Sequence, residues 1–205
     1  MDQFISQVYK KIDASSKKTV FVDRDGTINK EVHYLANPNQ LKIIPGVIDG
    51  IKKLNKYDIA VIVISNQPVI ARGLATLEDV RLINDTLVNL LDKEGAYINA
   101  IYFCPHHPER NHPDIPVHAM KYRIECECRK PKLAMFKKAI KDFNINLKSS
   151  FVVGDRTEDI KAGEDLGIQT ILVETGFGGK DNKYPILPNY KCGNLLNAAD
   201  IIINL

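Results

Sequence analysis

Short runs of apolar residues alternate along this chain with longer stretches in which apolar residues recur at helical spacing. Several of the short runs are apolar on both faces, as expected for parallel strands that helices cover on either side. Alternation of this kind predicts an α/β domain with a mainly parallel, doubly wound sheet. Five runs are strand candidates: 19–23, 59–64, 98–103, 151–153 and 170–173.

The stretches between these runs carry the signals of helices. Thr76 and Asp79 form the pattern of a capping box, in which each side chain binds the other residue's backbone N–H. A stretch after Gly46 places its apolar residues on one face. The helix candidates are the stretch after Gly46, a segment from Thr76 to about residue 94, and residues 132–143 and 158–166.

Residues 1–18 precede the α/β pattern as an N-terminal extension. The apolar residues of this segment fall at helical spacing: Phe4, Ile5, Val8, Tyr9 and Ile12. The spacing predicts a helix packed on a domain formed by residues 19–205. Charged residues interrupt the segment, which makes it a poor signal peptide, so the cytoplasm is the expected compartment.

The composition is that of a globular domain. The chain has 205 residues, of which 44% are hydrophobic and 26% charged, enough for one domain with a substantial core. Its net charge of +3, from 28 basic and 25 acidic residues, is too balanced to indicate a nucleic-acid partner. No apolar run approaches the roughly 20 residues that cross a bilayer, so no membrane partner is expected.

A pair of carboxylates follows the first strand candidate. Asp23 and Asp25 are one residue apart, and side chains alternate along a strand, so the two would share one side. Such a pair can hold a metal ion while its members divide nucleophilic and acid/base work. The simpler alternative is an acidic turn, because Asp25-Gly26 is a common turn dipeptide.

A second acidic group follows the fourth strand candidate. In a doubly wound, Rossmann-like sheet, ligands bind beyond the carboxyl ends of the strands. Asp155 could therefore meet Asp23 there and complete an oxygen site for Mg²⁺. Glu158 and Asp159 also suit the start of a helix, where acidic side chains interact favourably with the helix dipole.

Two further residues could bind phosphate. Ser65 follows the second strand candidate, where a hydroxyl and backbone N–H groups can bind an anion. Lys130 precedes a helix candidate, and an ammonium group can neutralise charge that develops in phosphoryl transfer. Each is an ordinary loop residue by itself, so its significance depends on the complete set.

Cysteine and histidine residues cluster in the segment 104–130. Cys104, His106, Cys126 and Cys128 form a Cys₃His set, typical of closed, tetrahedral structural zinc. The segment has little periodicity, so a zinc staple would hold it in place. Outside the set are Cys192 and three competing histidine ligands ranked below His106, namely His107, His112 and His118.

Together these groups resemble the motifs of the haloacid dehalogenase-like (HAD-like) superfamily of phosphohydrolases, in order, spacing and position after strands. The resemblance runs from about residue 19 to 173. The matching residues are Asp23, Asp25, Gly26 and Thr27 for the first motif, Ser65 for the second, Lys130 for the third, and Gly154, Asp155 and Asp159 for the fourth.

Four segments resemble one branch of that superfamily, the D-glycero-D-manno-heptose 1,7-bisphosphate 7-phosphatases, and their close relatives the histidinol-phosphate phosphatases. The segments are 23–29, 70–73, 104–108 and 126–131. The resemblance implies a domain without a large cap, in which the segments after Asn29 and Gln67 and the zinc loop shape the substrate site. It also implies substrate contacts from Asn29, Asn66, Gln67, Arg72, Arg129 and Lys130.

The same resemblance implies a phosphoaspartyl mechanism. Asp23 would attack phosphorus, while Asp25 would protonate the departing oxygen and then deprotonate water. Mg²⁺ would be held by the carboxylates of Asp23 and Asp155 and the backbone carbonyl of Asp25. Ser65 and Lys130 would hold the phosphoryl oxygens. The expected enzyme is a monomer that acts on a small phosphorylated sugar.

The resemblance implies D-glycero-D-manno-heptose 1,7-bisphosphate as substrate, in nucleotide-heptose or lipopolysaccharide synthesis, with histidinol phosphate as the alternative. The chain departs from the family pattern at Pro68-Val69 and Leu133-Ala134, and by a longer gap between His106 and Cys126. A zinc-stabilised nucleic-acid-binding module is the alternative of a different class. It is disfavoured because the chain lacks a basic stripe and crowds carboxylates at the same edge.

Overall fold

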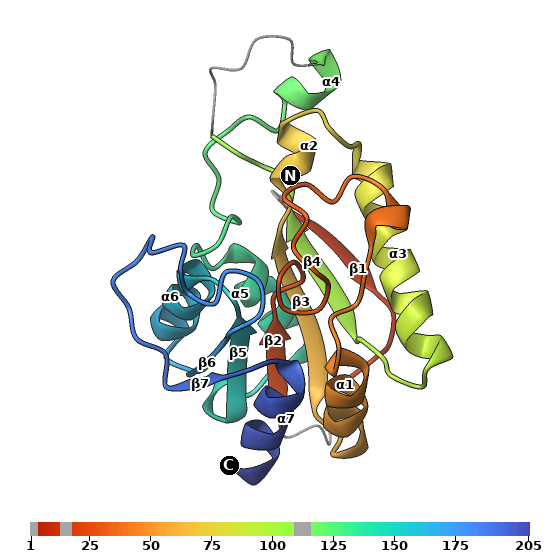
Figure 1. The fold of residues 1–205 in the computed structure, drawn as a ribbon. Helices are drawn as coiled ribbons and strands as arrows, with labels where there is room; N and C mark the ends of the chain where they lie inside the picture. The colour runs from red at the N-terminus through yellow and green to blue at the C-terminus, as the bar shows by residue number, and fades with distance from the viewer. Residues whose placement is uncertain (1–3, 13–17, 109–115) are drawn as a thin grey trace.

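Parallel strands form the centre of the molecule (Figure 1). The computed structural model describes residues 4–12, 18–108 and 116–205, and within them seven strands form one sheet in the order β1-β4-β3-β2-β5-β6-β7. The pairings from β4 to β7 are parallel, whereas β1 pairs antiparallel with β4 at the edge. The strands are β1 (Ile5–Val8), β2 (Thr19–Val22), β3 (Ala60–Asn66), β4 (Ala100–Cys104), β5 (Ser150–Gly154), β6 (Gln169–Val173) and β7 (Tyr190–Cys192).

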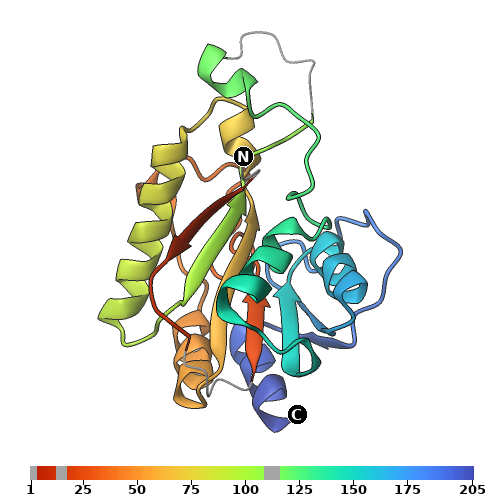
Figure 2. The ribbon, with the colours of Figure 1, turned by 180° about the vertical axis from the view of Figure 1, so that it is seen from behind.

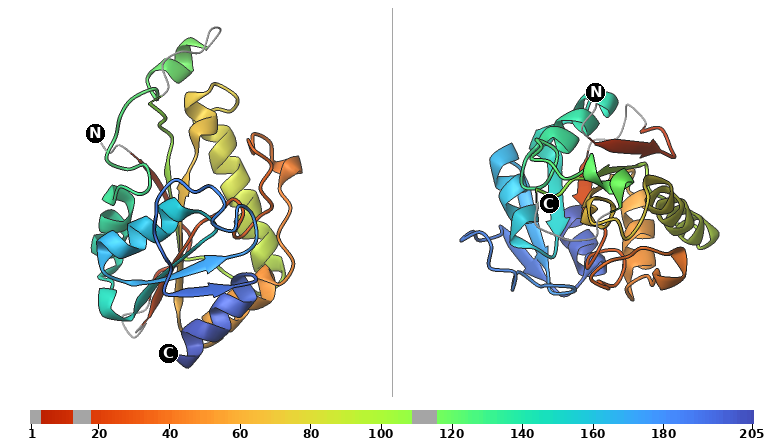
Figure 3. Two further views of the ribbon diagram at one scale, coloured as in Figure 1. Left: turned by 60° about the vertical axis from the view of Figure 1, so that its left-hand side comes forward. Right: turned by 90° about the horizontal axis from the view of Figure 1, so that it is seen from above.

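Helices cover both faces of this sheet. The helices are α1 (Val47–Lys56), α2 (Pro68–Ala71), α3 (Leu77–Lys93), α4 (Val117–Met120), α5 (Ala134–Phe143), α6 (Thr157–Leu166) and α7 (Leu195–Asn204), with short 3₁₀ turns at Pro38–Gln40 and Leu147–Ser149. Helices α1, α3 and α7 pack on one face and α5 and α6 on the other, as the view from behind shows (Figure 2). Figure 3 shows α7 lying beside α1. The predicted doubly wound α/β class is confirmed.

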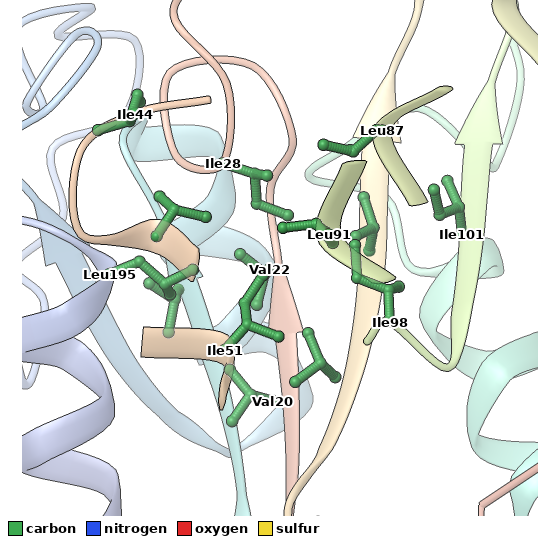
Figure 4. Packing of buried hydrophobic residues seen from close by; sticks show 14 of the residues in the cluster. Val20, Val22, Ile28, Ile44, Ile51, Leu87, Leu91, Ile98, Ile101 and Leu195 are labelled. Carbon is green, nitrogen blue, oxygen red and sulfur yellow. The ribbon is translucent and has the colours of Figure 1, made fainter. Parts of the chain in front are cut away.

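The strand β2 illustrates why the sheet is apolar on both faces. Val20 and Val22 belong to the core beneath α1, α3 and α7, where they pack with Ile51 and Leu91 (Figure 4). Phe21, between them, belongs to the core beneath α5 and α6. This alternation follows from strand geometry. Every residue of β2 is buried, which leaves the strand's carboxyl end as the place where its following polar residues can meet solvent.

The N-terminal segment is a strand, so the prediction of a helix there is wrong for residues 5–8. Ile5 pairs with Phe103 and Val8 with Ala100, because the edge of β4 offers unpaired backbone groups. Ile5 packs against the core beneath α3, whereas Phe4 packs on the opposite core. Apolar residues on both sides of this strand therefore give the same spacing as one face of a helix. Residues 1–3 and 13–17 lie outside the described residues.

The remaining predicted elements are present, with ends shifted by a few residues. Thr76 caps α3 through the predicted capping box with Asp79. Two elements beyond residue 173 had no counterpart in the predictions. β7 is only three residues long, and α7 begins after Asn194, whose side chain accepts a hydrogen bond from the backbone of Asn197. No helix in the described part of the chain combines the length and apolarity needed to span a membrane.

Candidate active site

The carboxyl ends of three neighbouring strands converge on one site. β2 lies between β3 and β5, so Asp23, which follows β2, is flanked by Ser65 from β3 and Asp155 after β5. The backbone N–H of Asp23 continues the β2–β5 ladder by donating to Val153 O at 2.9 Å. A pocket opens here, and its walls include Asp23, Asp25, Glu31, Tyr34, Asn66, Gln67, Pro68, Val69, Arg129, Lys130, Arg156 and Glu158.

Lys130 reaches the site from the loop before α5. Its Nζ lies 2.7 Å from Asp23 Oδ1, 2.6 Å from Asp159 Oδ1 and 2.7 Å from the carbonyl oxygen of Ile64. The side chain is only 3% exposed. Burial alone would lower the pKa of Lys130, but the carboxylates of Asp159 and Asp23 raise it. Lys130 is therefore a buried cation held between two acidic residues.

Three buried carboxylates lie together here, and two of them, Asp23 and Asp159, contact Lys130. Ligand oxygens of Asp23, Asp155 and Asp159 lie within 4.8 Å of one another. Burial, together with the charges of Asp23 and Asp159, raises the pKa of Asp155 to about 9. Burial also raises the pKa of Asp159, to about 7, although Lys130 opposes the shift. The three carboxylates carry more negative charge than Lys130 and the nearby Arg156 balance, so a further cation would stabilise the ionised form of the cluster.

Asp155 has one oxygen available for such a cation. Its Oδ2 accepts a hydrogen bond of 2.7 Å from the backbone N–H of Phe177, whereas its buried Oδ1 has no hydrogen-bond partner among the described residues. Gly26 and Gly176 have positive φ and lie so close that a Cβ on either would collide with the Asp155 carboxylate. An all-oxygen set with an orphaned carboxylate oxygen fits Mg²⁺.

Asp25 is held as a carboxylate by three side chains. Arg24 Nη2 lies 2.9 Å from Oδ2, Asn29 Nδ2 2.8 Å from Oδ1, and Gln67 Nε2 2.7 Å from Oδ2. Burial alone would raise the pKa of Asp25, but the charge of Arg24 and these hydrogen bonds lower it. Asn29 and Gln67, which were predicted to bind substrate, thus contact Asp25 in this structure.

Asn66 also bonds within the protein. Its Oδ1 accepts from the backbone N–H of Lys130 at 2.9 Å, and its Nδ2 donates to Glu158 Oε1 at 2.9 Å. Ser65 is buried, and its Oγ accepts from Gln67 Nε2 at 2.8 Å. These bonds connect the end of β3 to the Lys130 loop.

The two arginines predicted to bind substrate lie in different positions. Arg129 lines the pocket, and its Nη1 donates to the carbonyl oxygen of His106 at 3.4 Å. Arg72 stacks on the ring of Tyr34, which itself lines the pocket. Arg129 is thus directly at the pocket, whereas Arg72 reaches it through Tyr34.

The predicted cysteine and histidine ligands converge. Cys128 Sγ lies 3.0 Å from Cys104 Sγ, 3.3 Å from Cys126 Sγ and 3.3 Å from His106 Nδ1. These distances exceed the roughly 2.05 Å of a disulfide and approach the edge of a zinc tetrahedron. Burial raises the pKa of the Cys104 thiol. The thiolate form would therefore need a nearby cation, such as a metal ion, to stabilise it. The buried Cys₃His donor set fits Zn²⁺.

The competing ligands lie outside this cluster or outside the described residues. His107 and His118 do not belong to the cluster that the described residues form, and His118 is exposed. His112 lies outside the described residues. Cys192 is half-buried on β7, where its Sγ contacts the carbonyl oxygen of Asn194.

Glu158 and Arg24 are among the residues of the site that were not predicted. Glu158 is buried and bonds to Asn66 and, at 3.1 Å, to Lys183 Nζ. Burial alone would raise its pKa, but Lys130 and other nearby cations lower it. Arg24 is fully buried beside Asp25. Its position between two motif residues was the one signal in the sequence, because nothing local distinguishes a buried arginine from an exposed one.

Known proteins are similar to this chain in sequence. The HAD-hydrolase-like family model matches residues 127–198. The D-glycero-beta-D-manno-heptose-1,7-bisphosphate 7-phosphatase of Haemophilus ducreyi is 38% identical over 162 residues, which are 78% of this chain and 85% of that protein. The enzyme of the same name from Escherichia coli O6:H1 is 34% identical over 93% of this chain and 91% of its own length. The chain belongs to the heptose-bisphosphate phosphatase family of HAD-like hydrolases.

Solved structures agree with this membership. The D,D-heptose 1,7-bisphosphate phosphatase of B. bronchiseptica, solved with magnesium and phosphate, has a TM-score of 0.79 and 28% identity and covers 91% of this chain and 98% of its own. The chain is a phosphatase, and the resemblance seen in its sequence is confirmed.

Proposed function

We propose that this phosphatase removes the 7-phosphate of D-glycero-D-manno-heptose 1,7-bisphosphate through a phosphoaspartyl intermediate. The observation that carries the proposal is the buried contact of 2.7 Å between Asp23 and Lys130, with Asp25 and Asp155 beside it. Relatives named for this reaction are 34–38% identical over most of the chain.

Asp23 would act as the nucleophile. Its carboxylate oxygen attacks phosphorus, the bond from phosphorus to the sugar oxygen breaks, and Asp25 gives that oxygen a proton. Asp25 then takes a proton from a water molecule, which attacks the phosphoaspartate and releases phosphate. The lowered pKa of Asp25 suits this second, basic role. To act as the acid, Asp25 must first take up a proton, which the negative charge of an arriving phosphate favours.

Lys130 and Ser65 would hold the phosphoryl oxygens. We propose that the carboxylates of Asp23 and Asp155 and the backbone carbonyl of Asp25 hold Mg²⁺, which would reduce the repulsion between the anionic nucleophile and the anionic phosphate.

We also propose that Cys104, His106, Cys126 and Cys128 hold a structural zinc ion. Four protein ligands leave no open position for catalysis. Cys128 is two residues before Lys130, so a zinc ion would fix the backbone from which the lysine enters the site.

Metal-free protein should lose stability as the pH rises, and Mg²⁺ should restore it. Burial raises the pKa of Asp155 from its ordinary value of 3.8 to about 9 in the folded chain. Between about pH 4 and 9 the unfolded chain therefore loses this proton more readily than the folded chain, and the stability of the folded chain falls as the pH rises. Mg²⁺ at 100 times its Kd should add about 2.7 kcal/mol. Thermal melts with EDTA or Mg²⁺ at several pH values measure both effects.

The matched variant for this measurement is Asp155→Asn. It should lose the part of this pH dependence that Asp155 contributes and keep the part from Asp159, whose pKa burial raises to about 7. It should gain little stability from Mg²⁺, because its side chain is neutral. Asp165→Asn, which changes an exposed carboxylate on α6, the helix that follows Asp155, should behave as the wild type. An unchanged Mg²⁺ response in Asp155→Asn would contradict the metal assignment.

The substrate is tested by comparing phosphate release from heptose 1,7-bisphosphate and histidinol phosphate. We expect kcat/KM to be at least about tenfold higher for the heptose, a difference of about 1.4 kcal/mol. Among the departures from the family pattern, Pro68 and Val69 line the pocket, whereas Leu133 and Ala134 pack against the core beneath α5. Faster turnover of histidinol phosphate would overturn the substrate assignment. Pro68 and Val69 would then be the first positions to substitute, because they line the pocket.

A further inference from the structure

Arg24 is fully buried and contacts the carboxylate of Asp25, the next residue in the chain. Besides its contacts of 2.9 and 3.1 Å to the Asp25 carboxylate, Arg24 Nη2 donates to Gln67 Oε1 at 2.9 Å. Its other terminal nitrogen, Nη1, donates to Asn84 Oδ1 at 2.8 Å. Because the guanidinium group is planar, a bond at Nη1 fixes the direction in which Nη2 and Nε face Asp25.

Asn84 is an amide within the buried stripe of α3. Val80, Ile83 and Leu87 are its buried apolar neighbours on that helix. A buried amide is tolerated when both of its ends are hydrogen-bonded. The oxygen of Asn84 binds Arg24, and its Nδ2 donates to Gln7 Oε1 at 2.9 Å.

Gln7 belongs to the edge strand β1. Asp85, on α3, orients the side-chain amide of Gln7, because Gln7 Nε2 donates to Asp85 Oδ1 at 2.9 Å. Tyr9, two residues further on, donates to the same Asp85 oxygen at 2.8 Å but is not bonded to Asn84 or Arg24 in the described structure. A continuous series of hydrogen bonds therefore runs from Gln7 through Asn84 and Arg24 to Asp25.

We propose that Gln7, Asn84 and Arg24 are positioning residues, which orient the Asp25 carboxylate for proton transfer to the departing sugar oxygen. This inference rests on the acid/base role proposed for Asp25. It makes β1 a functional part of the phosphatase site. No new chemical step is involved: the proton still passes from Asp25 to the oxygen as its bond to phosphorus breaks.

The leaving group distinguishes such positioning from general support of the fold. A sugar alkoxide needs a proton as it departs, whereas p-nitrophenolate leaves readily without one. Loss of alignment at Asp25 should therefore slow the sugar phosphate far more than p-nitrophenyl phosphate. For both substrates kcat/KM reports the steps up to release of this group, so the comparison isolates the acid step.

The decisive variant is Asn84→Leu, assayed in the Mg²⁺-loaded full chain. We expect kcat/KM for the sugar phosphate to fall about 10- to 100-fold, within the range that general acid catalysis contributes, and mainly through kcat. The value for p-nitrophenyl phosphate should stay within about threefold. Asn84→Asp keeps an acceptor for Arg24 but has no donor for Gln7, so it should recover activity only to about the level of Gln7→Leu. Tyr9→Phe should match the wild type because it removes a β1–α3 bond to Asp85 but leaves the bond between Gln7 and Asp85 in place.

A second variant keeps the positioning role testable if Asn84→Leu does not fold. Gln7→Leu, on the partly exposed β1, should show the same leaving-group selectivity with a smaller loss of about three- to tenfold. Equal losses on both substrates, or no loss, would overturn the positioning role. If the wild type hydrolyses histidinol phosphate but not the heptose bisphosphate, the proposed substrate fails, and the same variants are compared on histidinol phosphate.

Discussion

Asp23→Asn should abolish phosphate release while leaving the fold intact. The amide is a poor nucleophile, and removal of an enzyme's nucleophile lowers the rate by roughly 10⁴-fold or more. The fold should survive because the amide oxygen of the new side chain could still accept the hydrogen bond from Lys130 that Asp23 Oδ1 accepts at 2.7 Å. Burial raises the pKa of Asp23, so a neutral side chain is tolerated there. Phosphate release and thermal melts measure the two effects.

A covalent test separates the nucleophile from its neighbours. Mass spectrometry of acid-quenched enzyme should find a phosphate adduct on the wild type and none on Asp23→Asn. Asp25→Asn should form the adduct from p-nitrophenyl phosphate but hydrolyse it slowly, because the base is missing. Glu164→Gln, at an exposed position of α6, is the control and should behave as the wild type. An adduct on Asp23→Asn would refute the assignment.

Cys126→Ser should release zinc and destabilise the segment 104–130. A structural zinc ion contributes strongly to folding, so we expect the free energy of unfolding to fall by at least about 3 kcal/mol. For a chain of this length that lowers the midpoint of thermal unfolding by about 6–12 °C. Activity should also fall, because Lys130 enters the site directly after the cluster. Metal analysis and thermal melts are the measurements.

The chain offers a matched control for this change. Cys192 is also partly buried, but it lies on β7 outside the cluster. Cys192→Ser should therefore keep both zinc content and activity. Unchanged zinc content in Cys126→Ser would exclude Cys126 as a ligand, and a zinc-free wild type of full stability would exclude the structural role.

The departures from the family pattern have unequal consequences. Pro68 and Val69 begin the short helix α2 and line the pocket, so they can affect which substrate binds. Leu133 and Ala134 lie at the start of α5 and pack against the core. Substrate preference is therefore best explored at positions 68 and 69.

Strand periodicity and motif order were sufficient to predict most of the fold and which motif residues lie together at the carboxyl end of β2. The runs that became β2 and β3 are buried on both faces, which a continuous apolar run already indicates in the sequence. Asp23, Ser65 and Asp155 each come at the end of a strand candidate, and parallel strands bring their carboxyl ends to one edge. Cys104 and His106 are two residues apart, so they could be paired as candidate metal ligands from the sequence alone.

Only the tertiary structure decided the N-terminal strand and the partners of the buried polar groups. Apolar spacing in residues 4–12 is compatible with a helix, and the free edge of β4 selected a strand. Gln7 and Asn84 are 77 residues apart, and Asn84 and Arg24 are 60 apart. Sequence patterns report which side of an element is buried. They do not report which distant side chain satisfies a buried donor, because that pairing exists only after β1, α3 and the end of β2 have packed together.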